Sequence, residues 1–504
     1  MGWTEIADVM ATRVAELEAF ANEVEADGFR DVVICGMGGS SLCSLVLQQA
    51  RQGATKFNLH VLDSTNATFV EQLTSKLDLD RSLFVVASKS GSTVEPKAFE
   101  EYFYNLIKQK RGDAAGRQFV AITDPGSPME AESKARGYRK IFLNFADIGG
   151  RYSVLSYFGL VTAALLGYDL TALLSSARRI SPATATSVAG SNAFSLGATL
   201  ADHAKAGRDK ITFLTSKSLD SFGLWAEQLI AESTGKHDKG VLPIAEEPIV
   251  PAEYYGDDRV FVSLQFGDEQ VLSENVKAAN LPLIERRIAS ESDLGAEFLS
   301  WEIATATIGA VLEINPFDQP NVQAAKDLAK AMLKQVEETG SLDEGEPSAE
   351  TEEWRVFAYG EKKIRSISEF LSTASNGDYI AILAFVPETP AVLEAMQRLR
   401  LSILERTRCA TTFGFGPRYL HSTGQFHKGG PKNGHFLVIT DVDSPKIETG
   451  LGFDFATLCR AQAIGDCHAL AEAGQQLMRL DLKAPISASS IDLIQHQIGA
   501  VSNR

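Results

Sequence analysis

The chain has 504 residues, which is enough for two to four domains with sizeable hydrophobic cores. Its 44% hydrophobic and 22% charged residues are typical of a soluble protein, and no apolar run approaches the roughly 18 residues that a membrane span needs. A net charge of −17 argues against nucleic-acid binding, and it means that an anionic ligand must be attracted by a local site.

The start of the chain predicts an amphipathic helix that carries acidic residues and contains no apolar signal core. We therefore expect a cytoplasmic protein. The five cysteines are scattered and form no C-x-x-C pair, which argues against a disulfide framework and against a zinc site.

A first set of strands is easy to trace. Short runs rich in Val, Ile and Phe alternate with longer helix-period stretches, a pattern typical of parallel α/β layers. The runs occupy residues 31–36, 57–63, 82–88, 118–123 and 139–144, with helical patterns over 41–51, 66–76 and 94–110. This part of the chain predicts one open parallel sheet.

A second and a third set of strand patterns follow along the chain. After a helix-rich stretch over 153–208, strand patterns occur at 210–216, 258–266 and 281–289. The acidic segment 336–353 lacks apolar periodicity and predicts a mobile linker or loop. Beyond it lie strand patterns at 379–386, 435–442 and 476–482, with helices near 388–406 and 455–474. We predict an α/β fold with two doubly wound parallel-sheet domains, over 1–175 and 176–335, an acidic linker over 336–354, and a smaller C-terminal α/β domain over 355–504.

Two serine-rich turns follow strands of the first set. GMGGSSL (36–42) comes after DVVIC, and SKSGSTVE (88–95) comes after LFVVA. Glycines let the backbone approach a ligand, hydroxyls add hydrogen-bond donors, and the next helix presents its positive end to an anion. The turns therefore predict a phosphate cradle.

Two other interpretations of these turns stay open. A G-x-G after a strand also begins dinucleotide-binding folds, and Asp63 at the end of the next strand is where a ribose-binding acid would sit. However, Ser41 occupies the place of the third glycine, and a dinucleotide fold does not need the second turn. Alternatively, the turns are ordinary Ser/Thr caps of two helices.

Five segments carry a resemblance to a known family. They are GMGGSSL (36–42), ASKSGSTVE (87–95), IGGRYSVLS (148–156), QLIAESTGK (228–236) and NPFDQPNVQAAK (315–326). In this order they resemble the glucose-6-phosphate isomerases, which are built from two sugar-isomerase domains. The chain looks most like the isomerase half of bacterial proteins that fuse transaldolase to this enzyme. The tail 415–431 resembles the extra C-terminal region of those fusions, and no transaldolase barrel is visible.

The resemblance implies roles for three side chains. Glu232 would be the base that moves a proton between C1 and C2 of a sugar phosphate, and Arg151 would stabilise the enediolate. An arginine suits this role because it stays protonated at neutral pH. Lys326 would help to open the sugar ring. The structural alternatives are a solvated glutamate, an interdomain salt bridge and a surface lysine.

The resemblance also assigns the phosphate-binding residues. Hydroxyls from Ser40, Ser88, Ser90 and Thr93 would bind the phosphate, Gly39 would let the backbone approach it, and Lys89 would add a backbone N–H and charge. We expect no cofactor and no metal.

One departure from the family concerns the ring-opening histidine. Longer family members carry a Gln-His dipeptide between the motifs of Glu232 and Lys326, but residues 240–325 contain no histidine, and His237 does not stand at the family's position. We hypothesise that the tail supplies this function, because polar residues cluster there: Arg418, His421, Gln425, His427 and Lys428. A metal pair of His421 and His427 is disfavoured by their spacing of six. A plain surface loop is the alternative.

Three functions are consistent with the sequence. The first is interconversion of glucose 6-phosphate and fructose 6-phosphate. The second is isomerisation of another or broader set of phosphosugars, such as mannose 6-phosphate, and the third is a sugar-phosphate-binding regulator without turnover. Each implies a small-molecule sugar phosphate as ligand, and no nucleic acid or membrane partner. The resemblance also suggests a homodimer.

Overall fold

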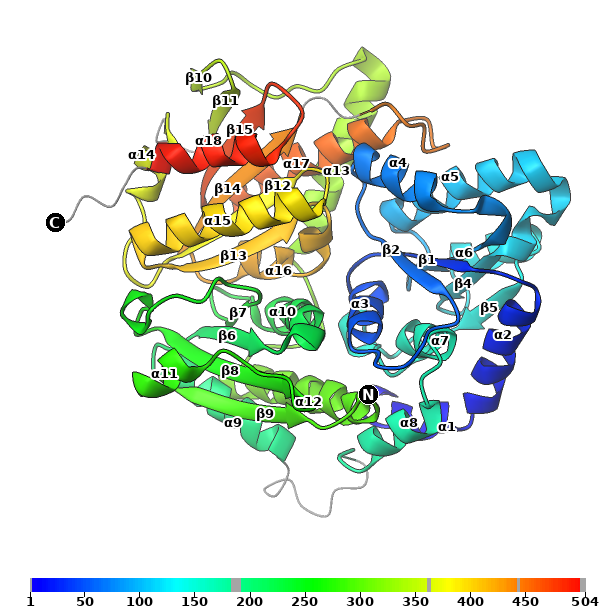
Figure 1. The fold of residues 1–504 in the computed structure, drawn as a ribbon. Helices are drawn as coiled ribbons and strands as arrows, with labels where there is room; N and C mark the ends of the chain where they lie inside the picture. The colour runs from blue at the N-terminus through cyan, green and yellow to red at the C-terminus, as the bar shows by residue number, and fades with distance from the viewer. Residues whose placement is uncertain (1, 183–191, 360–363, 442–444, 499–504) are drawn as a thin grey trace.

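The computed structural model describes residues 2–182, 192–359, 364–441 and 445–498. Within these residues the strands form three sheets flanked by helices (Figure 1). The first sheet lies at the right of Figure 1, the second at the lower left and the third at the upper left. This arrangement confirms the predicted α/β class, with two parallel sheets and a further α/β unit.

The first sheet is parallel and has the strand order β2-β1-β3-β4-β5, which is a doubly wound order. Its strands are β1 (Asp31–Gly36), β2 (Asn58–Leu62), β3 (Ser82–Ala87), β4 (Phe119–Thr123) and β5 (Lys140–Leu143). Alternate residues of β1 enter two different cores, since Val32 and Ile34 belong to one and Val33 and Cys35 to the other. Burial on both faces explains why this strand is apolar throughout. The helices of this part are α1 (Ile6–Ala11), α2 (Val14–Ala26), α3 (Leu42–Gln49), α4 (Ala67–Lys76), α5 (Val94–Arg111), α6 (Pro128–Ala135), α7 (Tyr157–Leu165) and α8 (Leu170–Arg178).

The second sheet is also parallel, in the order β7-β6-β8-β9. Its strands are β6 (Lys210–Thr215), β7 (Leu242–Ile244), β8 (Arg259–Phe266) and β9 (Leu283–Ile288). The sequence did not predict β7, because three residues are too few to show a strand pattern. The helices are α9 (Asn192–Lys205), α10 (Asp220–Thr234), α11 (Glu274–Ala278), α12 (Leu294–Leu312) and α13 (Val322–Thr339).

The third sheet is mixed, in the order β10-β11-β15-β14-β12-β13. Its strands are β10 (Ala349–Glu350), β11 (Trp354–Tyr359), β12 (Tyr379–Phe385), β13 (Ala410–Phe415), β14 (Gly434–Asp441) and β15 (Gln476–Leu482). The last four are parallel to one another, whereas β10 and β11 are antiparallel to their neighbours. The helices are α14 (Ile367–Leu371), α15 (Pro390–Thr407), α16 (Gly424–Gly429), α17 (Phe455–Glu472) and α18 (Ala488–Ile498). The sequence predicted neither β11 nor β13.

The acidic segment 336–353 differs from the expected mobile linker. Helix α13 continues to Thr339, and β10 pairs with β11. Between them, Glu344 accepts hydrogen bonds from two arginines, Arg460 and Arg479. These ion pairs tie the segment to the third sheet, and they are invisible to a reading of local apolar periodicity.

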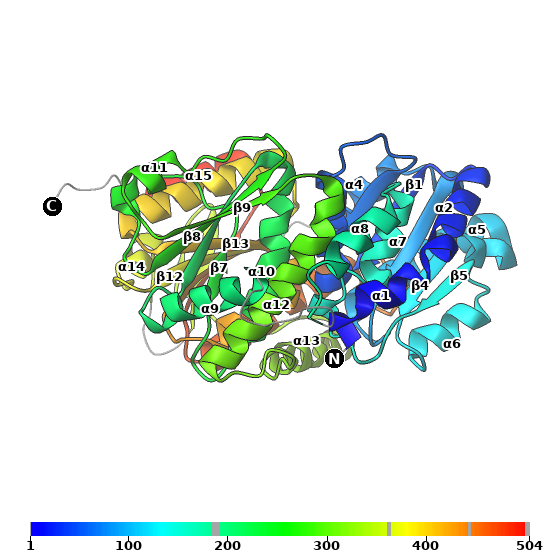
Figure 2. The same ribbon diagram turned by 90° about the horizontal axis from the view of Figure 1, so that it is seen from below.

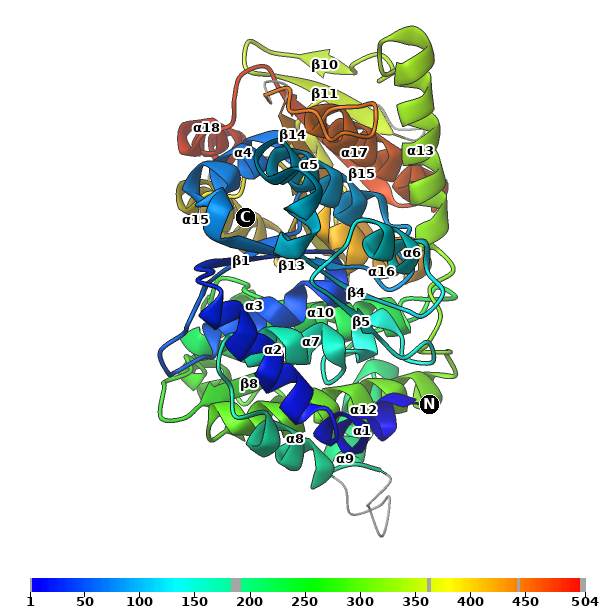
Figure 3. The same cartoon turned by 90° about the vertical axis from the view of Figure 1, so that its right-hand side faces the viewer.

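Apolar contacts join the three units, each of which consists of one sheet and its flanking helices. Val32 of β1 and Trp301 of α12 belong to one core, and Leu242 of β7 and Ala381 of β12 belong to another. Phe99 of α5 stacks on Phe455 of α17, with ring centroids 5.9 Å apart. Figure 2 shows the first unit beside the other two, and Figure 3 shows α13 running along α17 toward β10 and β11. Residues from all three units can therefore meet at one site.

Candidate active site

The two serine-rich turns lie next to each other. β1 and β3 are parallel neighbours with Gly36 opposite Ala87, so both turns leave the same edge of the first sheet. This is the point where the strand order reverses, a usual ligand position in such sheets. The turns form one wall of a cavity of about 720 Å³, within the range of small-molecule sites.

The predicted phosphate-binding hydroxyls gather at one end of this cavity, which is lined by Ser40, Ser88, Ser90 and Thr93. Ser88 is only 3% exposed, and its hydroxyl lies 3.5 Å from that of Thr93. Helix α5 begins directly after Thr93, so the free N–H groups of its first turn lie beside these hydroxyls. A hydroxyl cluster at a helix N-terminus suits a phosphate dianion.

The ammonium group of Lys89, which was expected to add positive charge for the phosphate, is paired with groups of the protein itself. Lys89 lines the cavity, but its ammonium group forms an ion pair with Asp124 and donates a hydrogen bond to the carbonyl oxygen of Ala146 at 3.1 Å. The positive charge is therefore compensated within the structure. Of the predicted contributions of Lys89, the backbone N–H is the one that stays a prediction.

Close backbone approach explains the glycines of the first turn. Gly38 has a φ of +55°, and a Cβ there would lie 2.6 Å from both Gln228 Nε2 and the His421 carbonyl oxygen. A Cβ on Gly39 would overlap the carbonyl oxygen of Gly150. The first turn is thus pressed against the elements that carry Arg151, Glu232 and the tail.

Glu232 lies in the same cavity, in the last turn of α10. Its side chain is 14% exposed, and Oε1 lies 3.5 Å from Nη1 of Arg151. Gln228, one turn earlier on the same helix, donates a hydrogen bond to Oε2 at 3.2 Å. The carboxylate is thereby oriented while part of it still faces the cavity.

Arg151 is almost fully buried and rigidly held. It sits in a single 3₁₀ turn, Gly150–Tyr152, and donates to Ser233 Oγ at 2.8 Å and to Gln319 Oε1 at 3.0 Å. Nη2 donates to the carbonyl oxygens of Pro316 and Asp318 at 2.6 and 2.9 Å. Four of the five N–H donors are thus taken, and the fifth, on Nη1, lies on the side of Glu232. These contacts also link the first unit to the second.

The tail does contribute a histidine. His421 lines the cavity, and its Nε2 lies 2.8 Å from Oε1 of Glu95 in α5. Its carbonyl oxygen accepts a hydrogen bond from Gln228 at 2.8 Å. Burial opposes ionisation of Glu95, but the adjacent His421, a backbone hydrogen bond and Lys326 together outweigh burial, so that the pKa of Glu95 lies below its ordinary value. The cavity is therefore lined by a histidine that is held by a buried carboxylate, as well as by the Glu232–Arg151 pair.

Comparison with known proteins is consistent with this constellation. Residues 8–244 match the family model described as Phosphoglucose isomerase. The match takes in a little under half of the chain. The matched region contains the phosphate turns, Arg151 and Glu232, and it ends before the tail that supplies His421.

Relatives that extend beyond this region carry related names. A glucose-6-phosphate isomerase of Synechococcus sp. (strain JA-3-3Ab) is 28% identical over 66% of this chain and 72% of the relative. One from Mycoplasmopsis pulmonis is 27% identical over 65% of this chain and 88% of the relative.

Solved structures show the same fold. A hypothetical protein from Thermus thermophilus aligns with a TM-score of 0.60, at 24% identity, over 66% of this chain and 90% of that chain. A glucose-6-phosphate isomerase from Chlamydia trachomatis aligns with a TM-score of 0.54, also at 24% identity, over 66% and 74%. The closer likeness to transaldolase fusion proteins stays a prediction.

The other four polar tail residues that the sequence singled out do not line this cavity. His427 is buried at 1% exposure beside Tyr379 and Phe436, so its predicted place in the active site is wrong. The remaining members bind partners elsewhere: Arg418 binds Asp63, Gln425 donates to the carbonyl oxygen of Gly235, and Lys428 forms an ion pair with Asp466. Lys326, in contrast, lines the cavity.

The dinucleotide interpretation is also corrected. Asp63 is fully buried, and both of its carboxylate oxygens accept hydrogen bonds from Arg418 at 2.8 Å. It cannot also hold a ribose. The strand end that would carry the ribose-binding acid instead anchors the tail.

Sequence reasoning missed three residues of the cavity region: Glu95, Gln228 and Gln319. Each stands inside a motif that the sequence had already singled out. Gln228 precedes Glu232 by four residues, a spacing that puts both on one face of a helix. The partner of Glu95 is 326 residues away, so no local signal identifies it.

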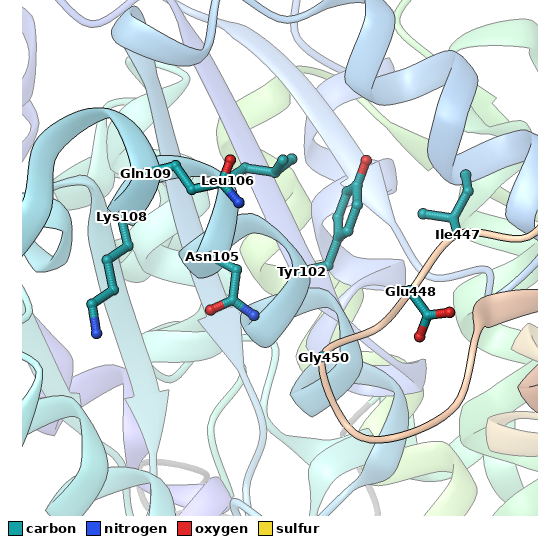
Figure 4. Close-up of a pocket in the computed structure, with 8 residues that line it drawn as sticks. All are labelled: Tyr102, Asn105, Leu106, Lys108, Gln109, Ile447, Glu448 and Gly450. Carbon is teal, nitrogen blue, oxygen red and sulfur yellow. The ribbon is translucent and has the colours of Figure 1, made fainter.

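A second hollow lies between α5 and the loop before α17, lined by Tyr102, Asn105 and Glu448 among others (Figure 4). It contains no paired base and cation. An acidic group on and beside this helix, formed by Glu100, Glu101 and Glu132, is paired with Lys97, whose ammonium lies within 3.2 Å of all three carboxylates, and with Arg136. Among the described residues, no helix is long and apolar enough to cross a membrane.

Proposed function

We propose that this protein is an aldose–ketose isomerase that interconverts glucose 6-phosphate and fructose 6-phosphate. The observation that carries the proposal is that one cavity is lined by a hydroxyl-rich end beside a helix N-terminus and also by a glutamate next to a buried arginine. The relatives named glucose-6-phosphate isomerase support the same substrate class.

The phosphate would be bound at the hydroxyl-rich end. Ser40, Ser88, Ser90 and Thr93 would donate hydrogen bonds to its oxygens, and the first turn of α5 would add its positive end. Because several donors share the dianion, loss of one hydroxyl should mainly raise KM. This binding would place C1 and C2 of the open-chain sugar near Glu232.

Glu232 would act as the base. Its carboxylate removes the proton from C2 of glucose 6-phosphate, and the electrons of that bond form the enediolate with the charge on O1. The protonated Glu232 then returns the proton to C1, while the proton of the C2 hydroxyl passes to O1, and fructose 6-phosphate results. The unused N–H of Arg151 would stabilise the oxyanion, and arginine does not compete for the proton.

His421 would open the ring. Glu95 holds Nε2 of the imidazole. Nδ1 of the protonated ring would then donate a proton to the ring oxygen while the C1 hydroxyl gives its own proton to water. Lys326, which lines the same cavity, would help to open the ring by contacting the ring oxygen. The first unit thus supplies Glu95, and the tail supplies the acid.

The test incubates the purified chain with fructose 6-phosphate and couples any glucose 6-phosphate to a dehydrogenase. Glu232→Gln should lower kcat by about 10³-fold or more while KM changes little, because only proton transfer is removed. Glu227→Gln is the matched control on the same helix. Burial raises the pKa of Glu227 to about 8, so that glutamine replaces a group that is already mostly neutral at pH 7.

Two results would refute the proposal. One is the absence of turnover by the wild-type chain, which would favour a binding protein. The other is an equal loss of kcat in Glu232→Gln and Glu227→Gln, which would indicate general damage to α10. Parallel incubation with mannose 6-phosphate distinguishes a strict isomerase from one with a broader substrate range.

A further inference from the structure

Arg418 links the tail to the first unit through an extensive ion-pair contact. Its Nε and Nη2 each donate to one oxygen of Asp63 at 2.8 Å, and Nη2 also donates to Glu388 at 2.7 Å. Asp63 follows β2 of the first sheet, whereas Glu388 follows β12 of the third. The fork of a guanidinium matches both oxygens of a carboxylate, which fixes direction as well as distance.

This contact lies one helical turn from the proposed acid. Arg418 and His421 are the first and last residues of the same short 3₁₀ helix. Arg418 does not line the active-site cavity, but His421 does. Ser41 of the first phosphate turn also lies 3.4 Å from Asp63, so the carboxylate touches both the turn and the arginine that holds the tail.

The His421 end of the helix is held by other groups. Glu95 binds the imidazole, and Gln228 binds the His421 carbonyl oxygen while also donating to Glu232. A shift of this short helix would therefore move the acid and would release the amide that orients the base.

We propose that Arg418 is a positioning residue that acts through His421: its bond to Asp63 holds the short helix Arg418–His421 so that the imidazole reaches Glu95 and the cavity. This inference rests on the proposed role of His421 in ring opening. A buried ion pair is by itself weak evidence for a gain in stability, so an orienting role has to be tested by its effect on His421.

The first arm of the test measures catalysis. Arg418→Lys keeps the charge but cannot bind both oxygens of Asp63, and it should lower kcat by about 10- to 100-fold with little change in KM. Arg460→Lys is the matched control, because Arg460 also bridges two carboxylates, Glu344 and Asp481, and does not line the cavity. It should leave kcat within about two-fold.

The second arm asks whether the effect passes through His421. In a chain that already carries His421→Asn, adding Arg418→Lys should cause no further loss of kcat, because the group that Arg418 positions is absent. Independent losses that multiply would overturn the proposal. So would an unchanged kcat in Arg418→Lys. If that variant does not fold, Asp63→Asn replaces it and carries the same expectations.

The third arm does not depend on turnover. In protein labelled at histidine, the NMR signal that is lost in His421→Asn identifies His421, and its chemical shift should change in Arg418→Lys and stay in place in Arg460→Lys. An unmoved His421 signal would refute the positioning role even in an inactive chain. An inactive wild type with a shifted signal would instead refute the proposed isomerase and retain the positioning contact.

Discussion

Replacement of Arg151 by lysine would test how the enediolate is stabilised. The guanidinium makes four hydrogen bonds, to Ser233, Gln319 and the carbonyl oxygens of Pro316 and Asp318. A lysine side chain ends in one ammonium nitrogen, whereas the guanidinium has three nitrogens that point in different directions. The ammonium can therefore reach the partners on only one side of the guanidinium. At least two charge-assisted bonds should therefore be lost.

The size of the effect follows from these contacts. A hydrogen bond to a charged group contributes about 1.5–3 kcal/mol, so two lost bonds should lower the free energy of unfolding by about 3–6 kcal/mol. Loss of one preorganised donor to an oxyanion costs about 10²–10³ in kcat. We expect Arg151→Lys to lose about 100-fold or more in kcat, while KM stays within about three-fold because the proposed phosphate-binding residues are others.

Two measurements check this prediction: the coupled assay with fructose 6-phosphate and urea unfolding monitored by fluorescence. Arg286→Lys is the control, because Arg286 binds both oxygens of Glu297 away from the cavity. It should lose stability without losing kcat. If Arg151→Lys keeps more than about a fifth of the wild-type kcat, Arg151 is a structural bridge between units and not the oxyanion donor.

Three further predictions concern packing and pH. Gly39→Ala should lower the urea midpoint by an amount equivalent to about 1–3 kcal/mol and raise KM, because the new methyl group overlaps Gly150; an unchanged KM would contradict this. Burial holds the pKa of His427 well below its ordinary value, so its protonation in the unfolded chain should destabilise the fold as pH falls below about 6.5. His427→Leu should make stability less dependent on pH in that range, as measured by urea unfolding at pH 5 and 7. The lowered pKa of Glu95 means that its ion pair with His421 stabilises the fold above about pH 4.5 and that this contribution is lost as pH falls through the native pKa. Glu95→Gln should therefore flatten the acid limb of the stability curve, and an unchanged limb would argue against the pair.

The local sequence pattern was enough to predict the strands of the first sheet and the two serine-rich turns that we propose bind the phosphate. A strand that is buried on both faces is a continuous apolar run, and Ser40 and Ser88 lie in the turns that follow two such runs. Because parallel strands end at the same edge of a sheet, the two turns were expected to meet. The short strand β7 has too few residues to form an apolar run that would predict it, and no local sequence pattern predicts the ion pairs of Glu344.

The choice between two histidines shows where local pattern ends. His421 and His427 are six residues apart in one polar, glycine-containing stretch, and the sequence assigned both to the site. The structure turns His421 toward Glu95, but it packs His427 between the aromatic rings of Tyr379 and Phe436. Which way each imidazole faces depends on partners from distant elements.

The sequence by itself determined the α/β class, because the strand and helix patterns depend on residues close together in the chain, and it identified the two serine-rich turns, Glu232 and Arg151 as candidates, the last two through the family resemblance. Only the tertiary structure decided which tail residue enters the cavity and which groups hold it there. The physical reason is that His421 is placed by contacts with Glu95 and Gln228, and its helix by Arg418 with Asp63, all of which join residues far apart in sequence.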